Sequence, residues 1–240
     1  WYTSYIAVWT LKYTLECFEK AGNLKEILEK VNFNTVTETG RWKDIIEKMY
    51  FPYDPSRRVF LQQDGFLDKE LLTTDQLTER PINQKWSWDR ILRSCFIKQA
   101  DVLQGLYFFE DDFDEDTHRR NFDFYEPMTV HESSLSPCVH SILACKLSKT
   151  EKAYEMYLRT SRLDLDDYNN DTEDGLHITS MAGTWLSVIK GFAGIRIKNT
   201  ELEINPHLPA QWKSLTFRMG TKSGLKEIYI DHEGYKVKEI

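Results

Sequence analysis

The sequence predicts a mainly helical fold that ends in a small antiparallel β region. Apolar residues recur at helical spacing over most of the first 194 residues, and prolines and polar loops separate these segments. From Ile195 onward, apolar and polar residues alternate with period two. Helices joined end to end by polar loops are typical of an α/α toroid or a helix bundle and not of a doubly wound sheet.

Two helical patterns open the chain. The first begins at once and has no initiator Met, so we expect a fragment of a longer polypeptide. Its shared face would contain Tyr5, Trp9 and either Leu11 or Tyr13. The second pattern has an apolar stripe at spacing i, i+3, i+4 and i+7 and ends at "FPYDP", residues 51–55. That stripe consists of Trp42, Ile45, Ile46 and Met49.

The middle of the chain alternates loops and helices. Residues 58–72 indicate an extended or looped stretch, and residues 86–109 indicate a long helical region. The buried side of that region would contain Ile91, Ile97, Val102 and Leu106. The acidic run 110–116 lacks the glycine and glutamate of a calcium loop, so we interpret it as a solvated loop.

Three more helical patterns precede the β region. Residues 137–147 have a short apolar face, and Ser148–Glu151 matches a capping box that would start the next helix. Residues 177–192 form the last helical pattern. Its apolar face aligns Met181, Trp185, Ile189 and Phe192. The strands that follow are broken by Asn199-Thr200, Pro206 and Gly234. We therefore divide the chain into residues 1–194 and a β domain, 195–240, which need not be complete.

Composition excludes several classes of function. The chain has 31 Lys and Arg against 38 Asp and Glu, a net charge of −7, so it has no basic footprint for nucleic acid. No long apolar run or leader predicts a membrane span or a signal peptide, and we expect a cytoplasmic protein. We interpret the four cysteines, which lack CxxC spacing, as buried thiols of a reducing compartment. They are Cys17, Cys95, Cys138 and Cys145.

Metal and cofactor motifs are absent from the sequence. His118, His207 and His232 have no zinc-ligand spacing, and neither HExxH, a Walker loop nor a dinucleotide fingerprint occurs. We therefore expect no metal and no cofactor.

Two segments suggest an anion site. Ser133, Ser134 and Ser136 stand just before a helical pattern, where free N–H groups and hydroxyls suit an oxyanion or phosphate, although one serine with Pro137 would suffice for ordinary capping. His177 likewise precedes small residues at a helix start. A hydrolase triad of Ser134, His177 and Asp174 is a weaker alternative, because no G-x-S-x-G elbow occurs.

Lys98 and Gln99 are candidates for binding a sugar. They lie within a helical pattern, where polar groups are costly to bury unless they bind something polar. A solvent-facing patch is the equally weighted alternative.

Three segments together resemble the disaccharide phosphorylases of glycoside hydrolase family 65. They are "IKQADVL" from Ile97, "YEPMTVHESSLSPCVHSI" from Tyr125 and "NDTEDGLHITSMAGTWLSVIKGFAGIR" from Asn170. The resemblance extends through "ELEINPHLPAQW" and implies that residues 1–194 are the second half of an (α/α)6 barrel, followed by the C-terminal β domain.

The resemblance also implies the reaction. Family members cleave an α-glucoside with inorganic phosphate and invert the anomeric centre, so that maltose gives β-glucose 1-phosphate and glucose. It implies that Ser133, Ser134 and His177 bind phosphate and that Lys98 and Gln99 hold the glucosyl unit. Inorganic phosphate is then a co-substrate, and a homodimer is expected for the full-length protein. His131 and Glu132 lie in the same motif without an assigned role.

The sequence departs from the family at the general acid. The family's acid is a glutamate in a "GPDEYHE"-like segment, upstream of an "NNAYTN" helix that "WYTSYIAVWTL" resembles at its start. No such segment occurs here, so we expect the catalytic acid upstream of residue 1 and an inactive isolated fragment. Glu132 and Glu173 are conceivable substitutes outside the matching motif.

Other functions remain open at this point. Trehalose, kojibiose or nigerose could replace maltose as the substrate. A non-catalytic carbohydrate-binding helical domain is an alternative from a different class.

Overall fold

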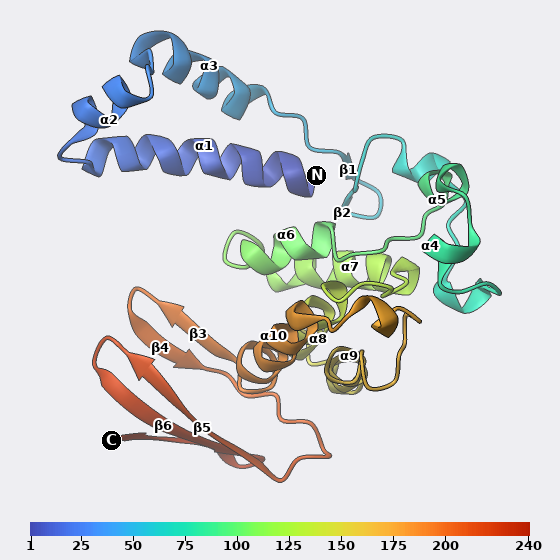
Figure 1. The fold of residues 1–240 in the computed structure, drawn as a ribbon. Coiled ribbons are helices and arrows are strands. Elements are labelled where there is room, and N and C mark those ends of the chain that lie inside the picture. Colours follow the sequence, from blue (N-terminus) through green and yellow to red (C-terminus); the bar gives the residue numbers. More distant parts are fainter. The chain divides into compact units, whose positions relative to one another are not determined.

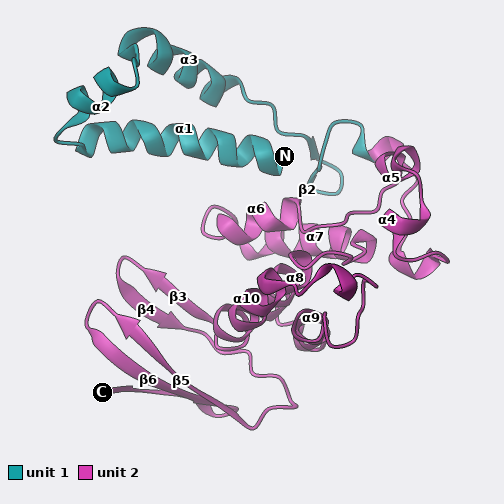
Figure 2. Ribbon diagram, in the orientation of Figure 1, with its two compact units in different colours: residues 1–66 teal, residues 67–240 magenta.

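The computed structural model describes residues 1–240 and divides into two compact units, residues 1–66 and residues 67–240 (Figure 2). Helices come first in the chain and strands β3 to β7 come last (Figure 1), so the predicted fold class is confirmed. None of the helices is both long enough and apolar enough to cross a membrane.

The first unit consists of three helices and a two-stranded hairpin. Their bounds are α1 Tyr2–Lys20, α2 Leu24–Lys30, α3 Thr35–Lys48, β1 Tyr53–Asp54 and β2 Val59–Phe60. Asn34 caps α3, because its side chain accepts a hydrogen bond from the Thr37 backbone N–H at 3.1 Å. The aromatic rings of Phe18, Phe33 and Trp42 pack α1 against α3, with centroids 5.0 to 5.9 Å apart.

The boundary between the units falls within the short turn η1, Phe66–Asp68. The second unit continues with short elements, whose bounds are η2 Thr74–Gln76, α4 Ile82–Lys85, α5 Trp88–Arg93, α6 Val102–Phe108, α7 Glu115–Tyr125 and η3 Glu126–Met128. The single long helix predicted over residues 86–109 is wrong, because residues 94–101 are not helical. Instead, the Ile97 N–H donates to the Met128 carbonyl at 3.0 Å and the Ile97 carbonyl accepts from Val130 at 2.9 Å.

Two further predictions need correction. The acidic run is exposed at residues 111, 112 and 114–116, as predicted for a solvated loop, although residues 115 and 116 belong to α7. Glu110 is the exception, because its largely buried carboxylate forms ion pairs with Lys146 and Arg196. Ser148 does not start a helix through a capping box. It ends the preceding one, with a left-handed φ of 58° and with its N–H donating to the Cys145 carbonyl at 2.9 Å.

Three helices form the core beneath the candidate site. They are α8 Ser136–Lys146, α9 Thr150–Ser161 and α10 Ile178–Leu186; η4, Thr172–Asp174, precedes α10, and the π-helical turn η5, Ser187–Phe192, continues it. Residues 136–145 of α8 are all buried. On α10 the predicted apolar face is only half correct, because Ile189 and Phe192 of η5 are buried but Met181 and Trp185 are exposed.

Helices α8 and α10 lie side by side and run in the same direction. Ser134, just before α8, contacts Thr179 in the first turn of α10. One turn further along, a Cβ at Gly183 would lie 2.9 Å from Cys138 Cβ. Beyond that, Gly191 lies against Ile142 and Cys145. The N-termini of both helices therefore lie at the same end of the pair.

The C-terminal strands confirm the period-two prediction. They are β3 Ile195–Lys198, β4 Glu201–Ile204, β5 Ser214–Thr221, β6 Gly224–Asp231 and β7 Gly234–Glu239, which form a two-stranded and a three-stranded antiparallel sheet. Asn199 and Thr200, both at positive φ, make the turn between β3 and β4. Ile228 and Ile230 of β6 are fully buried in one cluster with Ile189 and Ala193.

All four cysteines are free thiols. Cys95, Cys138 and Cys145 are buried as predicted, but Cys17 is exposed on α1. Burial raises the pKa of Cys138 to about 11 and that of Cys145 to about 12, so both thiols stay protonated at neutral pH.

The close contact at Gly183 yields a stability prediction. Gly183→Ala places a methyl group against Cys138 Cβ, so we expect the free energy of unfolding to fall by about 1–3 kcal/mol. Gly40→Ala is the matched control, because Gly40 lies inside α3 with no atom within 4 Å of an added Cβ, and it should raise stability by about 0.5–1 kcal/mol. Denaturant titrations measure both changes. Equal stability of the Gly183→Ala variant and the unsubstituted protein would contradict the close packing.

Candidate functional site

The candidate site lies where the segments preceding α8 and α10 meet. The Ser134 and Thr179 hydroxyl oxygens are 2.8 Å apart, and His177 is the N-cap residue of α10. The first N–H groups of a helix have no partner within the helix, and the aligned peptide dipoles place a partial positive charge there. Two parallel helices bring two such ends together, and this arrangement favours an anion.

The serine hydroxyls before α8 are not used to cap it. The N-cap residue is Leu135, without a side-chain hydrogen bond, so the alternative in which one serine caps this helix is wrong, whereas Pro137 does lie in the first turn. The buried Ser133 Oγ accepts the Leu135 N–H at 3.2 Å, and its own proton can still be donated. Ser136 Oγ instead contacts His131 Nδ1 at 3.1 Å.

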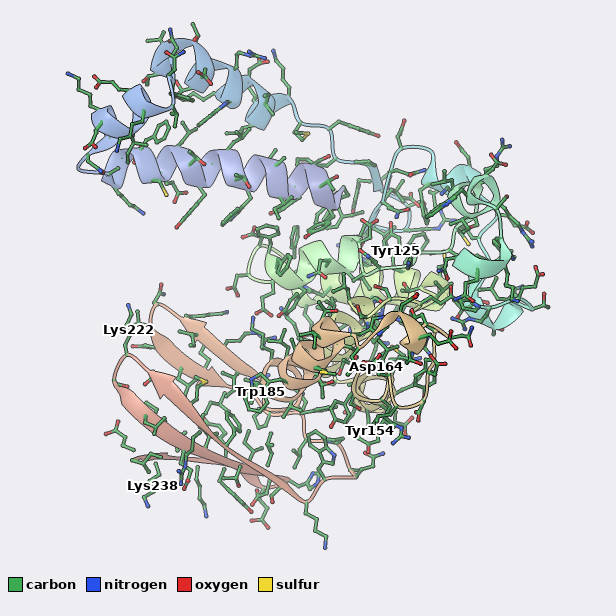
Figure 3. The ribbon with its side chains drawn as sticks, viewed as in Figure 1. Tyr125, Tyr154, Asp164, Trp185, Lys222 and Lys238 are labelled. Carbon is green, nitrogen blue, oxygen red and sulfur yellow. The ribbon has the colours of Figure 1, made fainter.

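His177 is held by a carboxylate that the sequence did not single out. Its Nδ1 lies 2.6 Å from Asp164 Oδ1, and its backbone N–H donates to Asp164 Oδ2 at 2.8 Å. Figure 3 labels Asp164 on the segment that joins α9 to α10. Burial acts to raise the pKa of the Asp164 carboxyl, but the hydrogen bonds from His177 outweigh it and lower that pKa.

A second carboxylate approaches the other ring nitrogen. Asp171 Oδ2 lies 3.6 Å from His177 Nε2. Asp174, which the hydrolase alternative paired with His177, is exposed on η4. The acid partner of His177 is therefore Asp164, and the hydroxyl of Ser134 contacts Thr179, so a triad of Ser134, His177 and Asp174 does not form.

Two arginines and Glu132 hold the backbone that leads to the serines. Arg80 donates to the Val130 carbonyl and to Glu132, and Arg159 donates to the His131 carbonyl at 2.9 Å. The other oxygen of the buried Glu132 accepts the Ile82 backbone N–H at 2.7 Å. Both Glu132 oxygens are thus engaged in holding the loop, and this use does not fit a proton donor.

Beneath the loop, His131 and His140 form a buried pair. Their rings are perpendicular with centroids 4.5 Å apart, and His131 has a left-handed φ of 54°. His131 Nε2 and both His140 nitrogens have no protein partner. Burial, assisted by the charge of Lys152, lowers the pKa of His140 to about 3. Burial and the proximity of His140 lower the pKa of His131 well below 6.5, so both rings are neutral at physiological pH.

A carboxylate oxygen of Glu126 and one ring nitrogen from each of the two histidines lie within 4.8 Å of one another, close enough for all three to bind one metal ion. Glu126 Oε1, however, lies 3.0 Å from the Lys152 ammonium, and the Arg159 guanidinium adds a second positive charge near His131. These cations oppose a bound metal cation. The cluster fits a neutral support of the loop better than a metal centre.

Lys98 and Gln99 lie beside the same loop but not on a helix. Both are exposed, in the irregular segment between α5 and α6, so their predicted helical setting is wrong. The pairing of Ile97 with residues 128–130 brings this segment alongside the chain that leads to Ser133. Exposed polar side chains at such a place are available to a ligand.

Two family models match this chain, one over the helical part and one over the C-terminal strands. Residues 1–186 match the model of the glycosyl hydrolase family 65 central catalytic domain, and residues 195–239 match the model of the family's C-terminal domain.

Named relatives are similar over almost the whole chain. A maltose phosphorylase of Bacillus subtilis is 52% identical over 97% of this chain, and an α,α-trehalose phosphorylase of Thermoanaerobacter brockii is 38% identical over 92%. The chain spans 31% and 29% of their lengths. A solved structure assigned as a kojibiose phosphorylase, from the human microbiome, superposes with a TM-score of 0.92 at 34% identity, over 100% of this chain and 32% of its own.

The buried histidine pair predicts acid sensitivity. His140 titrates at about 3 when folded and near 6.5 when unfolded, so between these values only the unfolded chain binds the proton. Stability should be full above pH 6.5 and fall as the pH drops toward 3, by about 2 kcal/mol at pH 5 from His140 alone. Urea titrations from pH 7 to pH 5 test this. His140→Met should flatten the decline, and the exposed control His232→Gln should not; equal slopes for both variants would refute the assignment.

Proposed function

This chain belongs to glycoside hydrolase family 65, and we propose that it supplies the phosphate- and glucosyl-binding part of an inverting disaccharide phosphorylase that acts on maltose. The products are β-glucose 1-phosphate and glucose. The observation that carries the proposal is the meeting of Ser134 and the His177 segment at the N-termini of two parallel helices.

Phosphorolysis with inversion has particular chemical needs. A carboxylic acid protonates the departing glycosidic oxygen while the nucleophile attacks the anomeric carbon from the opposite face. A hydrolase of this geometry needs a second carboxylate to activate water. Phosphate already carries its negative charge, so it needs hydrogen-bond donors that hold it and no base.

The donors at the site suit this task. Ser133 and Ser134 offer hydroxyl protons, His177 offers a ring nitrogen, and the helix ends add partial positive charge. In a chain of net charge −7, an anion is held by such local donors and not by a general positive field. We assign phosphate to these three residues and the glucosyl unit to Lys98 and Gln99.

We do not assign the general acid to a residue of this chain. Glu132 is engaged with Arg80 and Ile82, and Glu173 is exposed on η4. Since the chain spans less than a third of the relatives' lengths, we propose that the acid is supplied by a further part of the same enzyme. The full-length enzyme would act without a metal or organic cofactor, as a homodimer.

Maltose is favoured as substrate by similarity. The relative named maltose phosphorylase is 52% identical, whereas relatives named trehalose, kojibiose and nigerose phosphorylases are 38%, 33% and 27% identical. Phosphate attacks the anomeric carbon from the face opposite the departing sugar, so we expect the residues that hold phosphate to contribute little to the choice of linkage.

The substrate assignment predicts a ranking. The full-length enzyme should release β-glucose 1-phosphate from maltose with a kcat/KM well above those for trehalose, kojibiose and nigerose. Product release without phosphate would contradict phosphorolysis. Sugar binding that is independent of phosphate, without turnover, would favour a non-catalytic carbohydrate-binding domain.

The phosphate assignment predicts a selective kinetic defect. Replacing both Ser133 and Ser134 by Ala removes two hydrogen bonds to a charged ligand, so the KM for phosphate should rise about a hundredfold or more, with little change in the KM for maltose. Ser223→Ala, in the exposed turn between β5 and β6, is a hydroxyl-removing control that should leave both constants unchanged. An unaltered KM for phosphate in the double variant would rule out Ser133 and Ser134 as phosphate-binding residues.

A further inference from the structure

Asp164 lies six residues before the segment from Asn170 that carries the family resemblance, yet both its oxygens bind His177. Oδ1 lies 2.6 Å from Nδ1, and Oδ2 accepts the His177 backbone N–H at 2.8 Å. The two residues are 13 positions apart and the Asp164 side chain is largely buried, with 13% exposure. Because Asp164 holds both the ring and the backbone of His177, it fixes the orientation of the ring relative to the start of α10.

The hydrogen bond to Asp164 determines which ring nitrogen can meet a ligand. A carboxylate only accepts, so Nδ1 must carry a proton to bind Oδ1. The ring plane is then fixed, and Nε2 is the nitrogen left to face a ligand. Charge-assisted hydrogen bonds of this kind are among the stronger ones in proteins. Asp164 therefore prepares Nε2 without itself reaching the ligand.

Asp171 approaches the other nitrogen of the same ring. Its Oδ2 lies 3.6 Å from Nε2, the atom that a phosphate oxygen would approach. The Asp171 backbone N–H is in turn held by Asp167 at 3.1 Å, which keeps the residue near His177. A carboxylate at that position repels a phosphate and competes with it for the Nε2 proton.

We propose that Asp164 is a positioning residue for phosphate, which holds His177 through Nδ1–H so that Nε2 of the doubly protonated ring donates to the anion, and that Asp171 competes with phosphate for that nitrogen. This inference rests on the proposed phosphorylase function. It assigns opposite effects to two aspartates that carry the same charge and approach the same imidazole.

Asp164→Asn and Asp171→Asn form a matched pair of variants in the full-length enzyme. Asp164→Asn keeps the shape but presents an amide that cannot accept from both His177 N–H groups, so the KM for phosphate should rise about tenfold or more, with the maltose KM unchanged. Asp171→Asn should lower the phosphate KM severalfold. If charge alone mattered, removal of either carboxylate would lower it, so opposite directions identify positioning.

Nitrogen-15 NMR of the histidine side chains provides a readout that a merely structural role would not move. In the unsubstituted protein His177 should carry a proton at Nδ1 without phosphate and at both ring nitrogens with phosphate bound, and Asp164→Asn should give a mixture of ring tautomers without phosphate. Asp164→Glu, which keeps a carboxylate, should restore part of the phosphate affinity. If Asp164→Asn fails to fold, Asp171→Asn kinetics and the His177 tautomer of the unsubstituted protein decide the question.

The outcomes separate this inference from the proposed function. An unsubstituted full-length enzyme without phosphorolysis would refute the function. Normal activity combined with an unchanged phosphate KM in Asp164→Asn, with equal shifts in both Asn variants, or with His177 protonated only at Nε2 would overturn the positioning role and leave the function standing.

Discussion

The contact between α8 and α10 at Gly183 is the constraint on which the candidate site depends. A side chain at that position would collide with Cys138, so only glycine lets the two helices approach this closely. Because they run in the same direction, their N-termini meet, and the Ser134 hydroxyl lies 2.8 Å from that of Thr179. Two helix ends and two hydroxyls thus converge although the segments are about 45 residues apart in the chain.

Charged side chains hold the loop before α8 in place, and each of them forms an ion pair or a hydrogen bond there. Glu132 pairs with Arg80, and Arg159 donates to the carbonyl of His131, whose backbone is held at a left-handed φ. Strained backbone of this kind persists only where the surroundings over-determine it. The buried, neutral pair of His131 and His140 packs beneath, so the positive field at the loop comes from arginines and helix ends and not from these histidines.

The sequence predicted the features that depend on local pattern. The mainly helical fold, the period-two strands and the Ser133-Ser134 and His177 segments could all be found from residue spacing, and the resemblance to the family linked them. Features set by distant partners could not be found. Residues 94–101 leave the helix because Ile97 pairs with residues 128–130, and Glu110 is buried by Arg196, 86 positions later. Asp164 is one of several aspartates in an acidic stretch, and spacing alone does not show which one reaches His177.

The position of a bound oxyanion tests the proposed phosphate site directly. A crystal structure of the full-length enzyme with phosphate, or with tungstate located by its anomalous scattering, measures it. We predict one anion between the N-termini of α8 and α10, within hydrogen-bond distance of the Ser133 and Ser134 hydroxyls and of His177 Nε2. An anion bound elsewhere at saturating concentration, with these three groups untouched, would contradict it.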